Sequence, residues 1–300
     1  MELTAQPCSE ERAEHAEGPA WDAARGELLW VDIMAGRLWR ASYDGGGLVG
    51  ERSHDVGHAL GAAVPAAAGG WMLAAGEGFA HLAADGSVFV LDQPESVHGG
   101  RTRMNDGKCD PAGRFWAGSM AWDARPGAGT LYRLGLDAGL TTVLEGVTVS
   151  NGLAWAPDGY TMYYIDTDTH RVDAFDFDPD TGHAGNRRPV VEIPPEQGNP
   201  DGMTLDDDGF LWVALWGGRA VHRYDPTGRH VATVHVPATR VSSCCFGGDD
   251  RSTLFITTSR QQLTEEQLAA EPDAGRVFRA EPGVAGPPAT SYRGRVPSRT

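Results

Sequence analysis

The chain has 300 residues, 41% of them hydrophobic, and its 25 Lys and Arg against 41 Asp and Glu give a formal net charge of −16. This acidic balance argues against nucleic acid or an anionic membrane as a partner, and it mainly favours solubility. The length allows a large core in one or two domains. Its 40 glycines and 19 prolines suit many short strands joined by turns.

The cysteines and the N-terminal segment bear on the compartment. The four cysteines include no Cys-x-x-Cys spacing, and the adjacent Cys244 and Cys245 are poorly placed to form a disulfide. Free, buried thiols in a reducing compartment are therefore expected. The N-terminal segment has no apolar core typical of a signal peptide, and no apolar run approaches transmembrane length. These features predict a cytoplasmic protein.

Six sequence units of one pattern follow one another along the chain. In each, a small or glycine-led strand precedes a turn, an apolar strand, a second turn and a strand of alternating character, which indicates β-structure. The spacing of roughly 40–50 residues matches one four-stranded propeller blade. We predict one all-β domain over residues 1–300, a six-bladed β-propeller with a central channel, with blades that begin near residues 17, 60, 104, 150, 200 and 242.

Two insertions and a tail interrupt this pattern. A short helix is predicted over residues 263–269, with Thr264 as its N-cap, inside the sixth unit. A longer loop over residues 121–129 is a second insertion. The Pro- and Arg-rich tail is expected to be disordered after about residue 294.

Four units carry an oxygen-bearing side chain at the same place, near the start of their first strand: Glu17, Asn105, Asn151 and Asp201. Because the innermost strand of each blade lines the channel, we expect these side chains to converge at one mouth. Asn-Gly and Asp-Gly pairs are also ordinary turn signals, but recurrence at one repeat phase favours a site. An all-oxygen set suits Ca²⁺, Mg²⁺ or Mn²⁺, and Zn²⁺ also accepts oxygen ligands.

Other residues are candidates for the site or for the core. His15 lies two residues before Glu17 and could line the channel mouth, although a lone histidine is usually an ordinary polar residue. Cys244 and Cys245 are predicted to pack in the interior rather than to react. Tryptophans that recur at repeat phases are predicted to form the core between blades: Trp21, Trp30, Trp116, Trp155, Trp212 and Trp216.

Motifs over almost the full length resemble those of the SMP-30/gluconolactonase/luciferin-regenerating family, which includes regucalcin-like sugar lactonases: EGPAW at 17–21, RMNDGKCDPAGRFWAGSM at 103–120, SNGLAWAPDG at 150–159, VDAFDFDPDTG at 172–182, NPDGM at 199–203 and SSCCFGG at 242–248. The resemblance implies a six-bladed propeller with one divalent metal ion, Ca²⁺ before Zn²⁺, Mg²⁺ or Mn²⁺. The implied metal ligands are Glu17, Asn151 and Asp201.

The resemblance also implies that Arg103 and Asn105 bind substrate. The chain departs from the family in the loop after Met120, where regucalcin-like members carry a glutamate that helps to hold the sugar. Asp123, one methylene shorter and beside the bulky Trp122, is the nearest candidate for that role. The pattern of sugar hydroxyls that is recognised is therefore left open.

Together with the all-oxygen site, the resemblance implies a hydrolase that opens an aldono-1,5- or 1,4-lactone, a carboxylic ester hydrolase of the gluconolactonase type. The metal would act as a Lewis acid, and Asp201 would be the general base. Two alternatives stay open: a phosphotriesterase or other ester hydrolase on the same site, and a non-catalytic calcium-binding propeller. The expected partner is a small-molecule lactone, with no nucleic acid and no membrane, and the protein is expected to be a monomer or weak homodimer.

Overall fold

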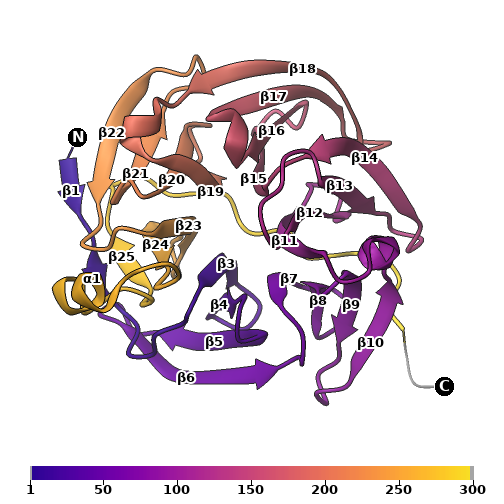
Figure 1. Cartoon of the computed structure of the whole chain (residues 1–300), viewed down its shortest axis with the longest axis horizontal. Coiled ribbons are helices and arrows are strands. Elements are labelled where there is room, and N and C mark those ends of the chain that lie inside the picture. Colours follow the sequence, from indigo (N-terminus) through magenta and orange to yellow (C-terminus); the bar gives the residue numbers. More distant parts are fainter. Residues whose placement is uncertain (1, 298–300) are drawn as a thin grey trace.

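The computed structural model describes residues 2–297 and places six β-sheets in a ring around a central channel (Figure 1). The predicted six-bladed β-propeller is confirmed.

In blades 1 to 4, four consecutive strands pair in sequence order from the channel outward. Blades 1 and 2 comprise β3 (Ala16–Asp22), β4 (Glu27–Asp32), β5 (Arg37–Tyr43) and β6 (Leu48–Asp55), then β7 (Leu60–Pro65), β8 (Trp71–Ala75), β9 (Gly78–Leu82) and β10 (Val88–Asp92). Blades 3 and 4 comprise β11 (Thr102–Cys109), β12 (Phe115–Ala121), β13 (Gly129–Leu134) and β14 (Leu140–Val147), then β15 (Ser150–Trp155), β16 (Thr161–Asp166), β17 (Arg171–Asp178) and β18 (His183–Glu192).

The two N-terminal strands, β1 and β2, complete blades 5 and 6. Blade 5 comprises β19 (Asn199–Leu205), β20 (Leu211–Trp216), β21 (Ala220–Tyr224) and β22 (His230–His235), with β1 (Glu2–Thr4) added in parallel to β22. Blade 6 comprises β23 (Val241–Gly247), β24 (Thr253–Thr258), β25 (Phe278–Ala280) and, as its outermost strand, β2 (Gln6–Pro7). Backbone hydrogen bonds between N-terminal and C-terminal strands thus close the ring.

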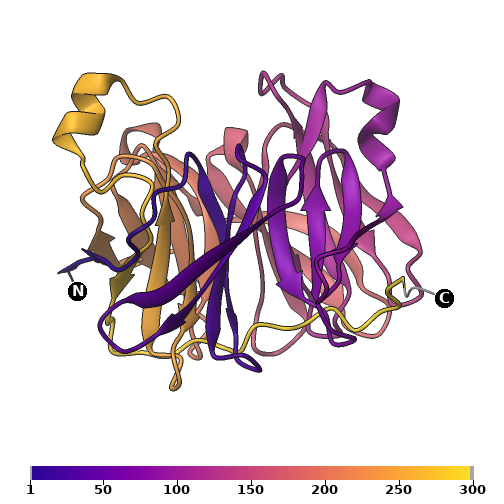
Figure 2. The same ribbon diagram turned by 90° about the horizontal axis from the view of Figure 1, so that it is seen from below.

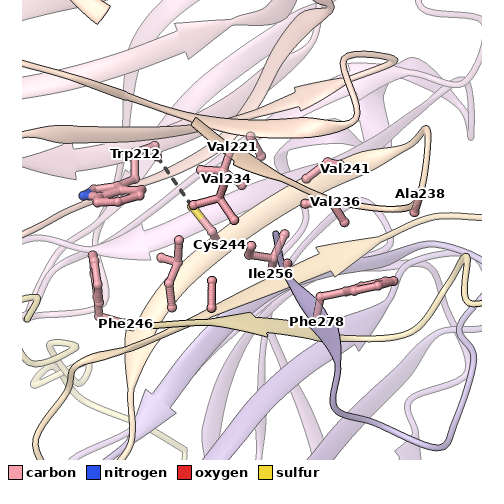
Figure 3. Packing of buried hydrophobic residues seen from close by; sticks show 14 residues of the cluster. Trp212, Val221, Val234, Val236, Ala238, Val241, Cys244, Phe246, Ile256 and Phe278 are labelled. Atoms are coloured by element: carbon pink, nitrogen blue, oxygen red, sulfur yellow. Dashed lines mark hydrogen bonds between the residues drawn. The ribbon is translucent and has the colours of Figure 1, made fainter. Parts of the chain in front are cut away.

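The hydrophobic core consists of six clusters, and each lies between two neighbouring blades. Figure 3 shows the cluster between blades 5 and 6, where Trp212 and Val221 face Cys244, Ile256 and Phe278. The Cys244 thiol donates to the Trp212 carbonyl at 3.5 Å, and all four cysteines are buried and free. Burial raises the pKa of the Cys244 thiol to about 12, so it stays protonated at neutral pH.

The helix α1 and the C-terminal segment lie on opposite sides of the ring. The predicted helix is confirmed as α1 (Glu265–Ala270), where the Thr264 hydroxyl accepts from the Gln267 N–H and the Gln267 side chain accepts from the Thr264 N–H. Three short 3-10 helices are η1 (Pro94–His98), η2 (Thr167–Thr169) and η3 (Pro195–Gln197). In Figure 2, α1 and η1 lie on one side of the ring and the C-terminal segment lies on the other. None of the described helices is long and apolar enough to cross a membrane.

The C-terminal segment crosses the end of the channel opposite α1 (Figures 1 and 2). Its start is held where the Asp207 N–H of blade 5 donates to the Ala285 carbonyl, and its far end where Tyr292 pairs with the backbone of blade 2. The Arg295 N–H donates to the Leu136 carbonyl at 3.0 Å, so the segment contacts blade 3 up to that point. The expected disorder after about residue 294 falls partly on residues 298–300, which lie outside the described residues.

Glycines allow the inner strands to approach one another closely around the channel. A Cβ on Gly61 of β7 would lie 2.0 Å from the Asn105 carbonyl oxygen of β11, and one on Gly152 of β15 would lie 2.8 Å from the Asp201 carbonyl oxygen of β19. The Asn-Gly and Asp-Gly pairs of the repeat therefore serve close strand packing, a role that the turn interpretation did not include.

Gly61→Ala is expected to destabilise the protein, because the added methyl meets backbone that must shift. Overpacking of this kind costs about 1–3 kcal/mol, so thermal unfolding should show a lower Tm than the wild type. Gly46→Ala is the control, since its nearest non-neighbouring atom, Asp44 Oδ1, would be 3.4 Å away in an exposed loop. Equal Tm values for the two variants would contradict the close-packing argument.

Candidate functional site

Each innermost strand is interrupted by a β-bulge at the repeat phase of the predicted site residues. In blades 3, 4 and 5, two residues oppose one residue of the second strand, and these pairs are 105–106, 151–152 and 201–202. In blade 1 the bulge follows Glu17 directly. A bulge turns side chains away from the regular alternation of a strand. The predicted site residues thus lie within the strands, at their bulges, rather than in turns before them.

Two aspartates at the ends of second strands fix the segments that lead into these bulges. The Asp32 carboxylate accepts hydrogen bonds from the N–H groups of Glu14 and His15, at 2.8 and 3.2 Å. The Asp166 carboxylate accepts in the same way from residues 148 and 149, at 3.1 and 3.0 Å. In both blades, an aspartate at the end of the second strand therefore holds the backbone just before the site residue, Glu17 or Asn151.

Three of the predicted site residues form a continuous hydrogen-bonded chain. Arg103 Nη1 donates to Asn105 Oδ1 at 2.6 Å, and Asn105 Nδ2 donates to Asn151 Oδ1 at 3.2 Å and to the Ser150 carbonyl at 2.8 Å. Asn151 Nδ2 in turn donates to the Thr167 hydroxyl at 2.8 Å. The Asn105 amide is thus engaged on both its oxygen and its nitrogen, whereas Asn151 Oδ1 keeps room for a further partner.

Three buried carboxyl groups lie together at the bulges. Glu17, Asp106 and Asp201 are 2%, 5% and 6% exposed, and the carboxyl groups of Glu17 and Asp201 share a hydrogen bond. Burial, and to a smaller extent the charges of Asp201 and Asp106, raise the pKa of Glu17 well above its usual value. Burial and the Asp106 charge raise the pKa of Asp201, and Arg103 opposes this rise.

Asp106 is a member of this cluster that sequence reasoning missed. Burial raises the pKa of Asp106, while the Lys108 charge and the Gly107 N–H oppose the rise. The strand alternation that the sequence predicts would turn Asp106 away from the channel if Asn105 faced it. The bulge makes both Asn105 and Asp106 face the channel. Only the prediction of a bulge at this Asn-Asp-Gly sequence would have indicated that Asp106 belongs to the cluster.

The arrangement fits a hard divalent cation. The two hydrogen-bonded carboxyl groups and the Asn151 amide oxygen are an all-oxygen donor set, and a cation between them would relieve the mutual repulsion of buried carboxylates. Within residues 2–297, no three His, Cys, Asp or Glu side chains are arranged to hold a metal ion by themselves. A metal site here therefore depends on the amide oxygen as well as on the carboxylates.

The loop after β12 brings Trp122, not Asp123, to the cluster. The guanidinium of Arg103 lies over the Trp122 ring, with its Cζ 5.3 Å from the ring centroid, and Trp122 is 49% exposed. Asp123 is exposed, and its carboxylate accepts a hydrogen bond from the Arg125 N–H at 3.2 Å, within its own turn. A substrate contact of Asp123 stays a prediction.

His15 is buried at the channel mouth, on the same side of the ring as α1. Its Nδ1 lies 2.6 Å from Gln261 Oε1, and its ring packs on Trp216 with centroids 5.2 Å apart. Burial and the Arg103 charge lower the pKa of His15 to about 3, so the imidazole is neutral at physiological pH. Trp216 is half-buried and belongs to this mouth region rather than to the core between blades.

A cavity of about 290 Å³ lies deeper in the channel, beyond the carboxyl cluster. Its walls include Asp106, Lys108, Ser243 and Cys245, and residues 287–290 of the C-terminal segment cover it. The cluster is therefore positioned between the mouth on the α1 side and a cavity whose wall includes part of the C-terminal segment.

The chain is similar to known proteins in both sequence and structure. The model of the SMP-30/gluconolactonase/LRE-like region matches residues 15–260. Regucalcin of Danio rerio is 40% identical over 291 residues, covering 95% of this chain and 96% of the relative. YvrE of Bacillus subtilis (strain 168), whose name carries a provisional assignment as a sugar lactone lactonase, is 38% identical over 95% of this chain and 97% of its own. The crystal structure of the calcium-binding protein regucalcin from Agrobacterium tumefaciens str. C58 superposes with a TM-score of 0.92 at 28% identity, covering 98% of each chain.

The fold and the site define a six-bladed β-propeller with a buried cluster of carboxyl and amide groups in its channel. The match over residues 15–260 and the identity to regucalcin then show the family. The chain belongs to the SMP-30/gluconolactonase/LRE-like family.

Proposed function

We propose that this protein is a metal-dependent hydrolase that opens sugar lactones to the corresponding aldonic acids. The observation that carries the proposal is the buried, hydrogen-bonded pair of Glu17 and Asp201 beside Asn151 and Arg103, in a chain of this family. The family name and that of the Bacillus subtilis relative refer to lactonases, which supports this class of substrate.

Glu17, Asn151 and Asp201 would hold one divalent cation. Ca²⁺ is the first candidate because all three donors are oxygens and a regucalcin of the same fold is described as calcium-binding; Zn²⁺, Mg²⁺ and Mn²⁺ accept the same donors. When bound, the cation supplies Lewis-acid polarisation of the lactone carbonyl and stabilises the negative charge that develops on its oxygen.

Side chains of the protein would transfer the proton, bind the substrate and position the catalytic groups. The buried Asp201 would accept a proton from the attacking water through a carboxylate oxygen that does not coordinate the cation. Arg103 Nε is buried and has no hydrogen-bond partner among the described residues, and the Arg103 guanidinium would donate to a substrate oxygen. Asn105 holds the Arg103 and Asn151 side chains in place.

Removal of the metal ion tests this function directly. Acid release from a panel of aldono-1,4- and 1,5-lactones would be followed before and after dialysis against a chelator. We expect the chelated protein to lose activity by about 10³-fold, because metal-ion stabilisation of the oxyanion contributes several kcal/mol, and one of the four cations to restore it.

The alternatives give different results in the same assay. Hydrolysis that is insensitive to chelation, or absent for every lactone, would overturn the proposal. Faster turnover of a phosphotriester than of any lactone would indicate an ester hydrolase of the other class. Calcium binding in a calorimeter without hydrolysis of either substrate would indicate a binding protein.

A further inference from the structure

Lys108 is the single lysine of the chain, and it lies inside the channel. It follows Asp106 by two residues on β11, and its half-buried side chain forms part of the cavity wall. Its Nζ donates a hydrogen bond to the backbone carbonyl of Met203, at 2.7 Å. Met203 lies on β19, two residues after Asp201.

This hydrogen bond joins two blades that are not neighbours. β11 belongs to blade 3 and β19 to blade 5, and the innermost strand of blade 4, β15, lies between them (Figure 1). The side-chain hydrogen bonds of Asn105 to Ser150 and of Cys244 to Trp212 also join two blades, but in those cases the blades are neighbours. A charged ammonium makes a stronger hydrogen bond to a carbonyl than a neutral donor does.

Contacts from outside its own sheet hold the backbone on both sides of Asp201. The Thr167 hydroxyl donates to the Pro200 carbonyl at 2.8 Å on one side, and Lys108 donates to the Met203 carbonyl on the other. Between them, Asp201 and Gly202 form the bulge and have no register partners in β20. The conformation that presents the Asp201 carboxyl therefore depends on bonds from blades 3 and 4.

We propose that Lys108 is a positioning residue, which holds the bulge of β19 from across the channel and so fixes the direction of the Asp201 carboxyl. The proposal rests on the proposed function for its effect on turnover. Without this bond, the peptide groups of residues 201–203 can rotate, and the carboxylate moves relative to the substrate. A displacement of about 1 Å at a reacting group costs on the order of 10²-fold in rate.

The test compares three variants of the full chain in Ca²⁺. Lys108→Met keeps the apolar stem and removes the donor, Lys108→Arg keeps a charged donor, and Arg188→Met removes an exposed charge on blade 4 as the control. We expect Lys108→Met to lower kcat by roughly 10–100-fold with KM changed by less than about threefold. Lys108→Arg should recover part of kcat, and Arg188→Met should match the wild type.

Hydrogen exchange of the peptide that contains residues 199–205 reports on the bond itself, independently of any substrate. Exchange there should be faster in Lys108→Met, with the other inner strands unchanged, and calcium affinity by calorimetry should weaken. If the wild type hydrolyses no lactone, the proposed function fails, while exchange and calcium affinity still decide on the role of Lys108.

Two results would overturn the proposal. One is wild-type kcat, exchange and calcium affinity in Lys108→Met; the other is faster exchange in all blades, which would show that Lys108 supports the fold as a whole. If Lys108→Met does not fold, Lys108→Gln, whose shorter amide cannot reach Met203, takes its place in the same comparison.

Discussion

Asp201→Asn is expected to lower kcat for the preferred lactone by about 10³-fold while the protein stays folded and still binds the cation. The amide keeps an oxygen that can coordinate the ion, but it cannot accept a proton from water at neutral pH. Proton transfer by a positioned base contributes about 10²–10⁴-fold, which sets the size of the loss. Steady-state kinetics, with calorimetric titration of Ca²⁺ into the variant, would measure both properties.

The environment of Asp201 makes this separation of roles feasible. Its carboxyl is buried, it is hydrogen-bonded to Glu17, and the backbone on each side of it is anchored from other blades. The substitution changes neither size nor these backbone contacts. Asp176→Asn serves as the control, since Asp176 is exposed on β17 and pairs with Arg188.

The kinetic result can contradict the assignment in two ways. A near-normal kcat for Asp201→Asn would remove Asp201 from the role of base and would leave it at most a ligand. Loss of calcium binding together with kcat would mean that Asp201 acts mainly through the cation. The first outcome would direct attention to Asp106, the other buried carboxyl group of the cluster.

The sequence predicts the fold and the residues at the repeat phase because both depend on local, periodic patterns. Alternating strands with regular turns predict the blades. Four residues occupy the same position in their repeat units, which predicts that they lie near one another: Glu17, Asn105, Asn151 and Asp201. The structure brings Asn105 and Asn151 into one hydrogen-bonded chain and joins Glu17 to Asp201. Their roles as ligands, base and substrate contacts are proposals.

The remaining parts of the cluster depend on features without a periodic signal. Asp106 faces it because of a bulge, and Lys108 reaches across the channel to a strand 95 residues further on. Thr167 enters from the connection after a second strand, through a hydrogen bond to Asn151. The position of Asp123 in the sequence predicts a substrate contact, but the loop conformation turns Trp122 toward Arg103 instead.

Asp110→Ala is expected to produce a large loss of stability. Asp110 is fully buried in the turn between β11 and β12, where its Oδ1 accepts from the N–H groups of residues 112 and 114 at 3.0 Å. Its Oδ2 accepts from Arg114 Nε at 2.5 Å and from Trp116 Nε1 at 3.0 Å. Removing the carboxylate leaves a buried guanidinium and a buried indole N–H without this partner.

Breaking a buried ion pair by removing one partner costs about 3–5 kcal/mol, and the lost hydrogen bond to Trp116 adds about 1 kcal/mol. Arg114 also donates to the carbonyls of Pro179 and Asp180 in blade 4, so the effect should reach the interface between the two blades. Denaturant unfolding at equilibrium, or Tm at one fixed scan rate, would measure the loss.

A second aspartate with the same turn chemistry but without buried partners separates the two contributions. Asp137 accepts the Gly139 N–H at 3.0 Å in an exposed turn, so Asp137→Ala removes a turn hydrogen bond and little else. We expect this control to cost less than about 1 kcal/mol. Asp110→Asn should fall between the two, because the amide oxygen can still accept one set of hydrogen bonds while the charge opposite Arg114 is lost. If Asp110→Ala cost no more than Asp137→Ala, the stability of this blade would come from its apolar packing, and the buried Asp–Arg–Trp group would contribute only to the shape of the turn.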